Sequence, residues 1–146
     1  MKGVQRELIT LTAPADLSAV SLINPMVAVV CNSCRMSEES RMKVGVAVEE
    51  VFTYCAGLIG KREEALRVTL FFYRDQDSLH VILEHAGPRG ELEDHLLPGA
   101  CSAIKRSSFE AMGLYIARES LDRLEYFPAA GGKHRFVLSK RLTGDD

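Results

Sequence analysis

The sequence predicts an α+β sandwich of two layers, in which an antiparallel or mixed sheet is covered on one face by helices. Alternating apolar and polar residues mark five candidate strands, and apolar residues at intervals of three and four mark three candidate helices. Two pairs of strands are joined by turns rich in Asp or Gly, which is typical of antiparallel hairpins. The resulting order is β, α, α, β, β, loop, α, β, β.

The size and charge of the chain limit its function. Its 146 residues, 47% of them hydrophobic, suit one domain spanning residues 1–146. Eighteen basic and twenty acidic residues leave a formal charge of −2, so we expect no broad basic surface and no nucleic-acid partner. Apolar runs such as residues 26–31 are too short to span a bilayer, and the amino terminus lacks the pattern of a secretion signal. We therefore expect a cytoplasmic protein without a membrane partner.

Four cysteines stand at positions 31, 34, 55 and 101, and without an export signal we expect them to be reduced. Only Cys31 and Cys34 have the two-residue gap of a metal or redox pair. No second pair or suitably spaced histidines accompany them, and they fall near the end of a predicted helix rather than at its start. Buried or incidental thiols are the expected outcome, with metal or redox chemistry as the alternative.

The first third of the chain predicts one strand and one helix. Residues 7–12 alternate as in a half-buried strand that stops before Pro14. Asp16 is a candidate N-cap for a helix whose apolar positions continue to residue 34. Because proline lacks an amide hydrogen and clashes with the preceding turn, Pro25 predicts a kink or a break near Asn24.

The stretch 44–57, VGVAVEEVFTYCAG, predicts a buried helix that carries a candidate site. Ser37 can cap this helix, and Gly57 and Gly60 can close it. Its core-facing positions are Val44, Val48, Val51, Cys55 and Leu58. Glu50 and Tyr54 then share a neighbouring face, where a carboxylate loses hydration unless it faces a cleft or finds partners. The alternative is that the two adjacent glutamates are simply solvated.

The second half of the chain predicts two hairpins on either side of a long connection. The expected strands are residues 67–74 with 78–84, and residues 124–127 with 134–139. Residues 85–90 form a loop, and residues 91–110 are expected to contain a short helix and a mobile segment that acts as a lid or binding loop. A third helix is expected at residues 113–122.

Three stretches resemble a known family: AVEEVFTYCAG at 47–57, LEHAGPRG at 83–90 and MGLYIARESLDRLEY at 112–126. They are similar to the anti-sigma-factor serine kinase branch of the GHKL ATPases, which have the Bergerat ATP-binding fold. The likeness covers nearly the whole chain, so it implies one histidine kinase-like ATPase domain. It also implies a sigma factor or its small antagonist protein as the partner, and a homodimer.

The resemblance assigns roles to residues of the second helix. Glu50 stands at the place of the glutamate that acts as general base in the family. Tyr54 stands at the place of the asparagine that holds magnesium against the phosphates. Because Mg²⁺ prefers carboxylate, amide or water oxygens, a phenol is a poor ligand for it. We therefore assign no metal-binding residue and do not expect Mg²⁺.

Two further motifs of the family are matched in altered form. His85-Ala-Gly87-Pro-Arg89 replaces an Asp-x-Gly-x-Gly turn, with His85 in place of the aspartate that binds the adenine amino group. Ala111-Met-Gly113-Leu114 replaces a Gly-x-Gly-Leu whose amides, at the start of a helix, suit phosphate oxygens. The nucleotide-binding residues implied by the resemblance are Tyr54, His85, Gly87, Arg89, Met112, Gly113 and Leu114. Three altered motifs argue against ordinary ATP turnover, so ATP stays a candidate ligand that these changes disfavour.

Three functions follow from these observations. The first is a regulatory protein of the anti-sigma factor type that has a degraded ATP-Mg site and acts mainly by binding proteins. The second is an active ATP-dependent serine kinase with Glu50 as base. The third is a sensor of nucleotides or small anions, with His85, Arg89, Lys105 and Arg106 facing the ligand. If Tyr54 and Arg89 fill the nucleotide cleft, the regulatory protein without ATP turnover is favoured over the kinase.

Overall fold

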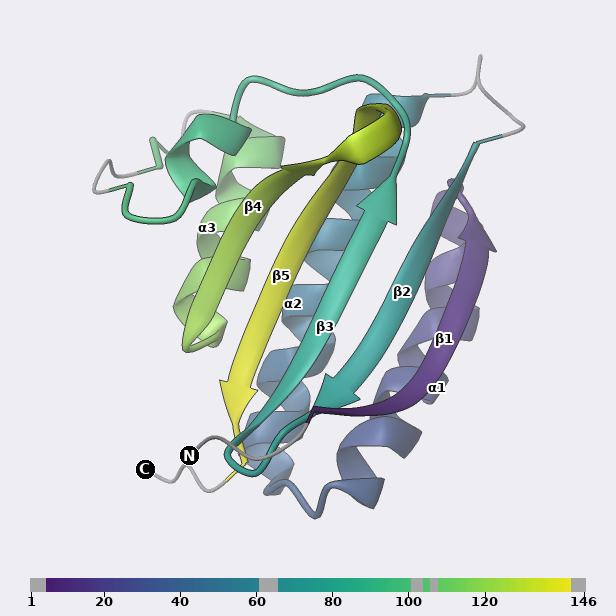
Figure 1. Cartoon of the computed structure of the whole chain (residues 1–146), viewed down its shortest axis with the longest axis vertical. Coiled ribbons are helices and arrows are strands. Elements are labelled where there is room, and N and C mark those ends of the chain that lie inside the picture. Colours follow the sequence, from purple (N-terminus) through teal and green to yellow (C-terminus); the bar gives the residue numbers. More distant parts are fainter. Residues whose placement is uncertain (1–4, 61–65, 101–103, 106–107, 143–146) are drawn as a thin grey trace.

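The computed structural model describes residues 5–60, 66–100, 104–105 and 108–142. It is an α+β sandwich of two layers, with a five-stranded sheet in front and three helices behind it (Figure 1). The strands are β1 (Arg6–Pro14), β2 (Arg67–Arg74), β3 (Ser78–His85), β4 (Arg123–Ala129) and β5 (Lys133–Arg141). The helices are α1 (Val20–Ser33), α2 (Glu38–Ile59) and α3 (Phe109–Ser120), with short 3-10 helices η1 (Leu17–Ala19), η2 (Glu93–Leu96) and η3 (Ala130–Gly132). The predicted fold class and element order are confirmed.

The sheet is antiparallel throughout, in the order β1-β2-β3-β5-β4. Both predicted hairpins are present, as β2 with β3 and β4 with β5. One row of paired residues crosses all five strands on the open face: Thr10, Phe71, Ile82, Val137 and Glu125. β1 and β4 form the two edges, and β1 contains an irregularity between Glu7 and Ile9.

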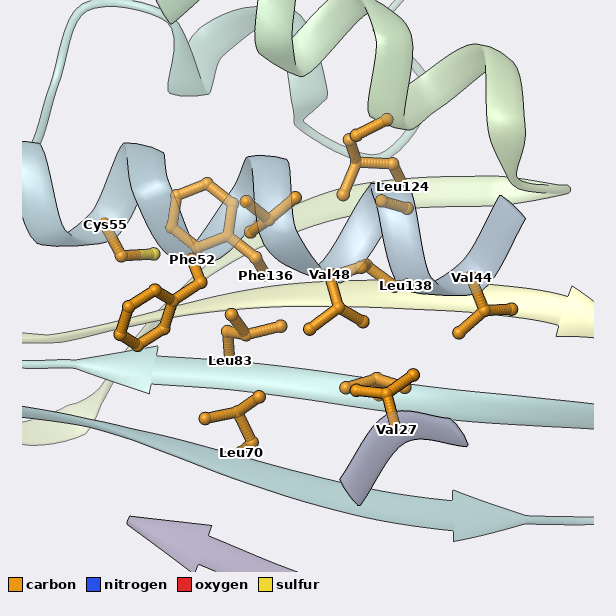
Figure 2. Packing of buried hydrophobic residues seen from close by; sticks show 14 of the residues in the cluster. Val27, Val44, Val48, Phe52, Cys55, Leu70, Leu83, Leu124, Phe136 and Leu138 are labelled. Atoms are coloured by element: carbon orange, nitrogen blue, oxygen red, sulfur yellow. The ribbon is translucent and has the colours of Figure 1, made fainter. Parts of the chain in front are cut away.

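Helix α2 lies across the middle of the sheet and supplies much of the core. Ser37 caps it by accepting a hydrogen bond from the Ser40 amide, and Gly60 ends it with a φ of 69°. Gly57, the other residue predicted to close the helix, lies within α2. Figure 2 shows Val44, Val48, Phe52 and Cys55 of α2 together with side chains of the sheet. The predicted core face is confirmed except at Leu58, which is only partly buried.

Helix α1 is continuous through Pro25, so of the kink or break predicted near Asn24 the break was wrong. Pro25 is the sixth residue of α1, and at this place a proline removes a single hydrogen bond within the helix. The residues that follow it still bury Val27, Val30 and Cys31 against the core, which stabilises the helix across the proline. The chain turns earlier, because the Asp16 side chain caps η1 rather than α1.

Helix α3 begins at Phe109 and not at Gly113 as predicted. Ser108 caps it by accepting a hydrogen bond from the Ala111 amide at 3.1 Å. Gly113 is therefore the fifth residue of the helix, and its amide lies within the helical hydrogen-bond ladder. The cap was missed because it follows an irregular stretch around Pro98 and Gly99 that has no helical periodicity.

The two layers differ in charge. The strands carry eight basic and three acidic residues, whereas the three helices carry six acidic and three basic ones. All of the helical charges belong to α2 and α3, because α1 has none. The sheet is therefore the basic layer, and the acidic residues of the other layer lie on two of its helices.

The thiols of Cys31, Cys34 and Cys55 are buried, as expected. Burial, together with the nearby Cys34, raises the pKa of the Cys31 thiol to about 12, so this side chain stays protonated. Cys101 lies outside the described residues. Within the part of the chain that the structure describes, no group of three or more His, Cys, Asp or Glu side chains could hold a metal ion. In the same part of the chain, no helix has both the length and the apolar character needed to cross a membrane.

Candidate functional site

A cleft of about 890 Å³ opens on the outer side of α2. One wall is formed by Glu50, Thr53, Tyr54 and Gly57 of α2, and another by Phe109, Glu110 and Gly113 of α3. The end of β1 and the start of η1, with Asp16 and Leu17, complete it. Among the described residues that line the cleft, the charged ones are Asp16, Glu50 and Glu110, and none is basic. The described lining of the cleft is therefore acidic.

Glu50 and Gly113, two of the predicted site residues, come together in this cleft. A Cβ added at Gly113 would lie 2.5 Å from Oε1 of Glu50, so the glycine allows α3 to pack closely against the carboxylate. Glu50 is half-buried, and loss of hydration raises its pKa, with a further increase from the adjacent Glu49. A raised pKa makes Glu50 a better proton acceptor than a solvated carboxylate.

Tyr54 is buried and bound to a residue that the sequence did not identify. Its hydroxyl donates a hydrogen bond of 2.6 Å to Oε1 of Glu93, which lies in η2. Glu93 is 0% exposed, and its Oε2 accepts a second hydrogen bond, of 2.8 Å, from the Gly90 amide. Burial, followed by the bond to Glu93, raises the pKa of the Tyr54 phenol. The side chain at the expected magnesium-binding position is therefore engaged with a carboxylate of the segment after β3.

Gly90 allows this contact. A Cβ at Gly90 would lie 2.2 Å from the Tyr54 hydroxyl and 2.8 Å from Cδ2 of Leu58. Such distances leave no room for a side chain, so the backbone at Gly90 packs directly on α2. The sequence signal for Glu93 was its place between Leu92 and Leu96 in an apolar pattern, where a carboxylate is not expected unless it is paired.

His85 is 2% exposed and lies away from the cleft. Its Nδ1 accepts a hydrogen bond of 3.0 Å from the Gly87 amide, which assigns the proton to Nε2, a buried atom without a hydrogen-bond partner among the described residues. The ring packs on His134, with 5.0 Å between ring centroids, and on Phe136. Burial, and secondly His134, lower the pKa of His85 to about 4, so the ring is neutral near pH 7.

The other predicted site residues occupy several environments. Arg89 is exposed, pairs with Asp94 and places its guanidinium 5.4 Å from the centroid of the Tyr126 ring. Met112 is 39% exposed and Leu114 is fully buried, so they lie on different faces of α3. Lys105 is exposed, and Arg106 lies outside the described residues. Of the predicted residues, Glu50, Tyr54 and Gly113 line the cleft, whereas His85, Gly87, Arg89, Met112, Leu114 and Lys105 do not.

The comparison with solved structures supports the fold. No family model matches the chain, and no curated protein matches it. Seventeen chains of solved structures do match. One of them belongs to the crystal structure of the SiaB-SiaC complex from Pseudomonas aeruginosa, with a TM-score of 0.54 and 12% sequence identity. The match covers 94% of this chain and 91% of that chain. At this identity the likeness concerns the fold alone.

Gly90→Ala is expected to destabilise the protein by about 1 to 3 kcal/mol, because its methyl group would push Tyr54 and Glu93 apart. Urea unfolding followed by circular dichroism measures this change. Gly57→Ala is the matched control, since a Cβ there meets no atom within 4 Å and alanine favours the helix by up to about 1 kcal/mol. Equal stabilities of the two variants would contradict the close packing at Gly90.

His85 is expected to make stability depend on pH between about 6.5 and 4. Its pKa is lower in the folded state, so the unfolded chain binds more protons in this interval and stability falls as the pH falls. The loss is on the order of 2–3 kcal/mol between pH 7 and pH 4. Urea unfolding across this interval measures it.

His85→Asn is the control for this pH dependence, because an asparagine oxygen can still accept the Gly87 amide but does not titrate. At each pH the free energy of unfolding of the variant is subtracted from that of the native chain, which removes the contribution of other titrating groups. Glu50, whose raised pKa acts in the opposite direction, is one of them. A difference that is independent of pH would show that His85 does not titrate as described.

Proposed function

We propose that this protein is a regulator of the anti-sigma factor type, which acts mainly by binding other proteins and has a degraded ATP-Mg site. The observation that carries the proposal is the buried hydrogen bond between Tyr54 and Glu93. It lies where the family resemblance expects an asparagine that holds magnesium. The histidine kinase-like domain, its Bergerat fold and a cytoplasmic location are parts of the same proposal.

The oxygen atoms of this pair are poorly disposed to bind a cation. The Tyr54 hydroxyl uses its proton to bind Glu93, and both carboxylate oxygens of Glu93 already accept hydrogen bonds. Mg²⁺ requires several oxygens in octahedral geometry and gives up its water ligands reluctantly. Binding it here would require the buried bond to open and the segment after β3 to move, which costs the free energy of that packing.

The charge of the cleft also disfavours a nucleotide. A triphosphate needs cations or free amides around it, whereas the charged residues in the described part of the lining are Asp16, Glu50 and Glu110. Two amides of α3 are not available to it, because the Ala111 amide donates to the Ser108 side chain and the Gly113 amide lies inside the helix. Among the described residues of the lining, an anion would meet three carboxylates and no cation.

The same cleft suits a protein partner with a basic and apolar surface. Phe109, at the edge of the cleft, is 95% exposed, and Glu110 stands next to it. Exposed aromatic side chains beside charges are typical of binding surfaces. The related fold of a chain from a complex of two proteins supports a binding role. By the family resemblance, the partner is a sigma factor or its small antagonist.

Two alternatives differ in their support. Glu50, with its raised pKa in an open cleft, favours the active kinase as the second candidate. The anion sensor requires unpaired cations at the ligand, whereas Arg89 pairs with Asp94 and Lys105 does not line the cleft. We therefore retain the kinase as the only alternative.

Thermal melts with and without millimolar Mg-ATP test the main proposal. We expect the melting temperature to change by less than about 1 °C, because a ligand that does not bind the folded state cannot stabilise it. Tyr54→Asn is the matched variant, since it restores the amide and removes the bond to Glu93. If Mg-ATP raises the melting temperature of this variant but not that of the native chain, the phenol of Tyr54 is the reason why the native chain does not bind the nucleotide. A rise of several degrees in the native chain would contradict the proposal.

The kinase alternative is tested by phosphate transfer from labelled ATP to a purified sigma factor or antagonist protein. If it is correct, Glu50→Gln is expected to reduce the rate by about 100-fold or more, because the amide cannot accept the proton of the serine hydroxyl. Glu49→Gln is the matched control, as it removes the neighbouring carboxylate, which is exposed. Transfer by the native chain that survives Glu50→Gln would exclude this role for Glu50.

A further inference from the structure

One face of the sheet is turned away from the three described helices. Figure 1 shows the molecule from this side, with α1, α2 and α3 behind the strands. Buried residues such as Leu70, Leu83 and Phe136 point toward the helices, and the residues that alternate with them along the strands point to the other side. This other side is the open face of the sheet.

Three half-buried apolar side chains form a row in the middle of the open face. Phe71 pairs with Ile82, and Ile82 pairs with Val137 on the next strand. Cβ atoms of residues directly opposite in an antiparallel pair lie about 4.5–5.5 Å apart, so these side chains contact one another across three strands. The ring of Tyr73 stacks on Phe71, with 6.4 Å between the ring centroids. Phe71, Ile82 and Val137 are called the apolar row below.

Four cations of β4 and β5 lie on both sides of the apolar row, and each stands beside a carboxylate. In every one of these ion pairs the cation is the more exposed member. The side chains of the cations are 48% to 70% exposed, whereas those of the carboxylates are 10% to 35% exposed. The pairs are Arg123 with Glu125, Lys133 and Arg135 with Glu84, and Arg141 with Asp122.

Two ion pairs of the described chain that lie outside the open face have the opposite order of exposure. The side chain of Lys43 is 44% exposed and that of its partner Glu39 is 80% exposed. The side chain of Arg89 is 45% exposed and that of Asp94 is 71% exposed. On the open face the carboxylates therefore lie close to the sheet and the cations extend over them, so a partner would meet positive charge first.

The three arginines of the open face also keep donors for a partner. Arg123, Arg135 and Arg141 each face their carboxylate with Nε. A guanidinium carries four further N–H groups on its two terminal nitrogens, and this fork matches a carboxylate. The contacts of Arg123 and Arg141, at 3.8 and 3.9 Å, are longer than hydrogen bonds. These two side chains are therefore able to turn toward a partner at little cost.

We propose that the open face is a docking surface for an acidic segment of another protein. Apolar side chains of this segment cover the apolar row, and carboxylates on either side of them bind Arg123, Arg135 and Arg141. Burial of the apolar row stabilises the complex, and the exposed cations select a partner of negative charge. A phosphate backbone fits less well, because its closely spaced charges would also meet the carboxylates of Glu84 and Glu125.

This surface belongs to the other layer of the sandwich from the acidic cleft. The cleft is walled by α2 and α3, whereas the cations of the open face belong to β4 and β5. The two surfaces differ in the sign of their exposed charge, so they select different partners. The inference therefore does not rest on the proposed function.

Fluorescence anisotropy of a labelled peptide, Glu-Glu-Leu-Val-Leu-Glu-Glu, tests the docking surface with the full chain. We expect a dissociation constant below about 100 µM at low salt. The double variant Arg123→Glu, Arg141→Glu is expected to weaken binding by about 10-fold or more, because two attractions become repulsions. Lys43→Glu, Arg118→Glu is the matched control, since it makes the same change of charge on α2 and α3. We expect it to change the dissociation constant by less than about twofold.

Amide chemical shifts of the isotope-labelled native chain locate the peptide without any substitution, which covers the case in which the double variant fails to fold. We expect the largest changes on β3, β4 and β5, around Ile82 and Val137. Changes confined to α2 and α3 would overturn the proposal. Absence of binding up to about 1 mM, or equal losses of affinity in the two double variants, would overturn it as well. Tighter binding of an oligothymidylate of the same length would replace the acidic protein by a nucleic acid.

Discussion

The hydrogen bond between Tyr54 and Glu93 fixes the arrangement of the site. A carboxylate that is completely buried is tolerated only where donors replace its hydration, and Glu93 has two of them, the Tyr54 hydroxyl and the Gly90 amide. Together they tie the segment after β3 to α2. Leu96 is buried beside them, while Arg89 and Asp94 pair on the outer side of the same segment. Tyr54 therefore both lines the cleft and joins this segment to α2.

Periodicity was sufficient to predict most of the elements, and specific contacts explain the failures. The core face of α2 and both hairpins follow from local alternation, which depends only on neighbouring residues. The break predicted at Pro25 is absent because this proline lies near the start of a helix whose later turns are well buried. The start of α3 depended on one serine cap after an irregular stretch. In each case tertiary packing or a single side chain outweighed the local rule.

The site could be predicted only in part. Glu50 and Tyr54 were recognised because a helical period places them beside the core, and both line the cleft. Glu93 is 39 residues from Tyr54, and no local pattern encodes a contact over that separation. The burial of His85 against His134 likewise depends on the pairing of β3 with β5. A fold does not determine function, so the role of the cleft has to be argued from the residues that line it.

The division of charge between the layers has a consequence for encounters in solution. Among the described helices and strands, basic strands on one side and acidic α2 and α3 on the other separate charge between the two layers. A cationic protein that approaches is turned toward the acidic layer before the surfaces touch, which raises the rate of productive collisions. Added salt shortens the range of this attraction. The association rate constant therefore falls, while contacts at short range in the complex are little affected.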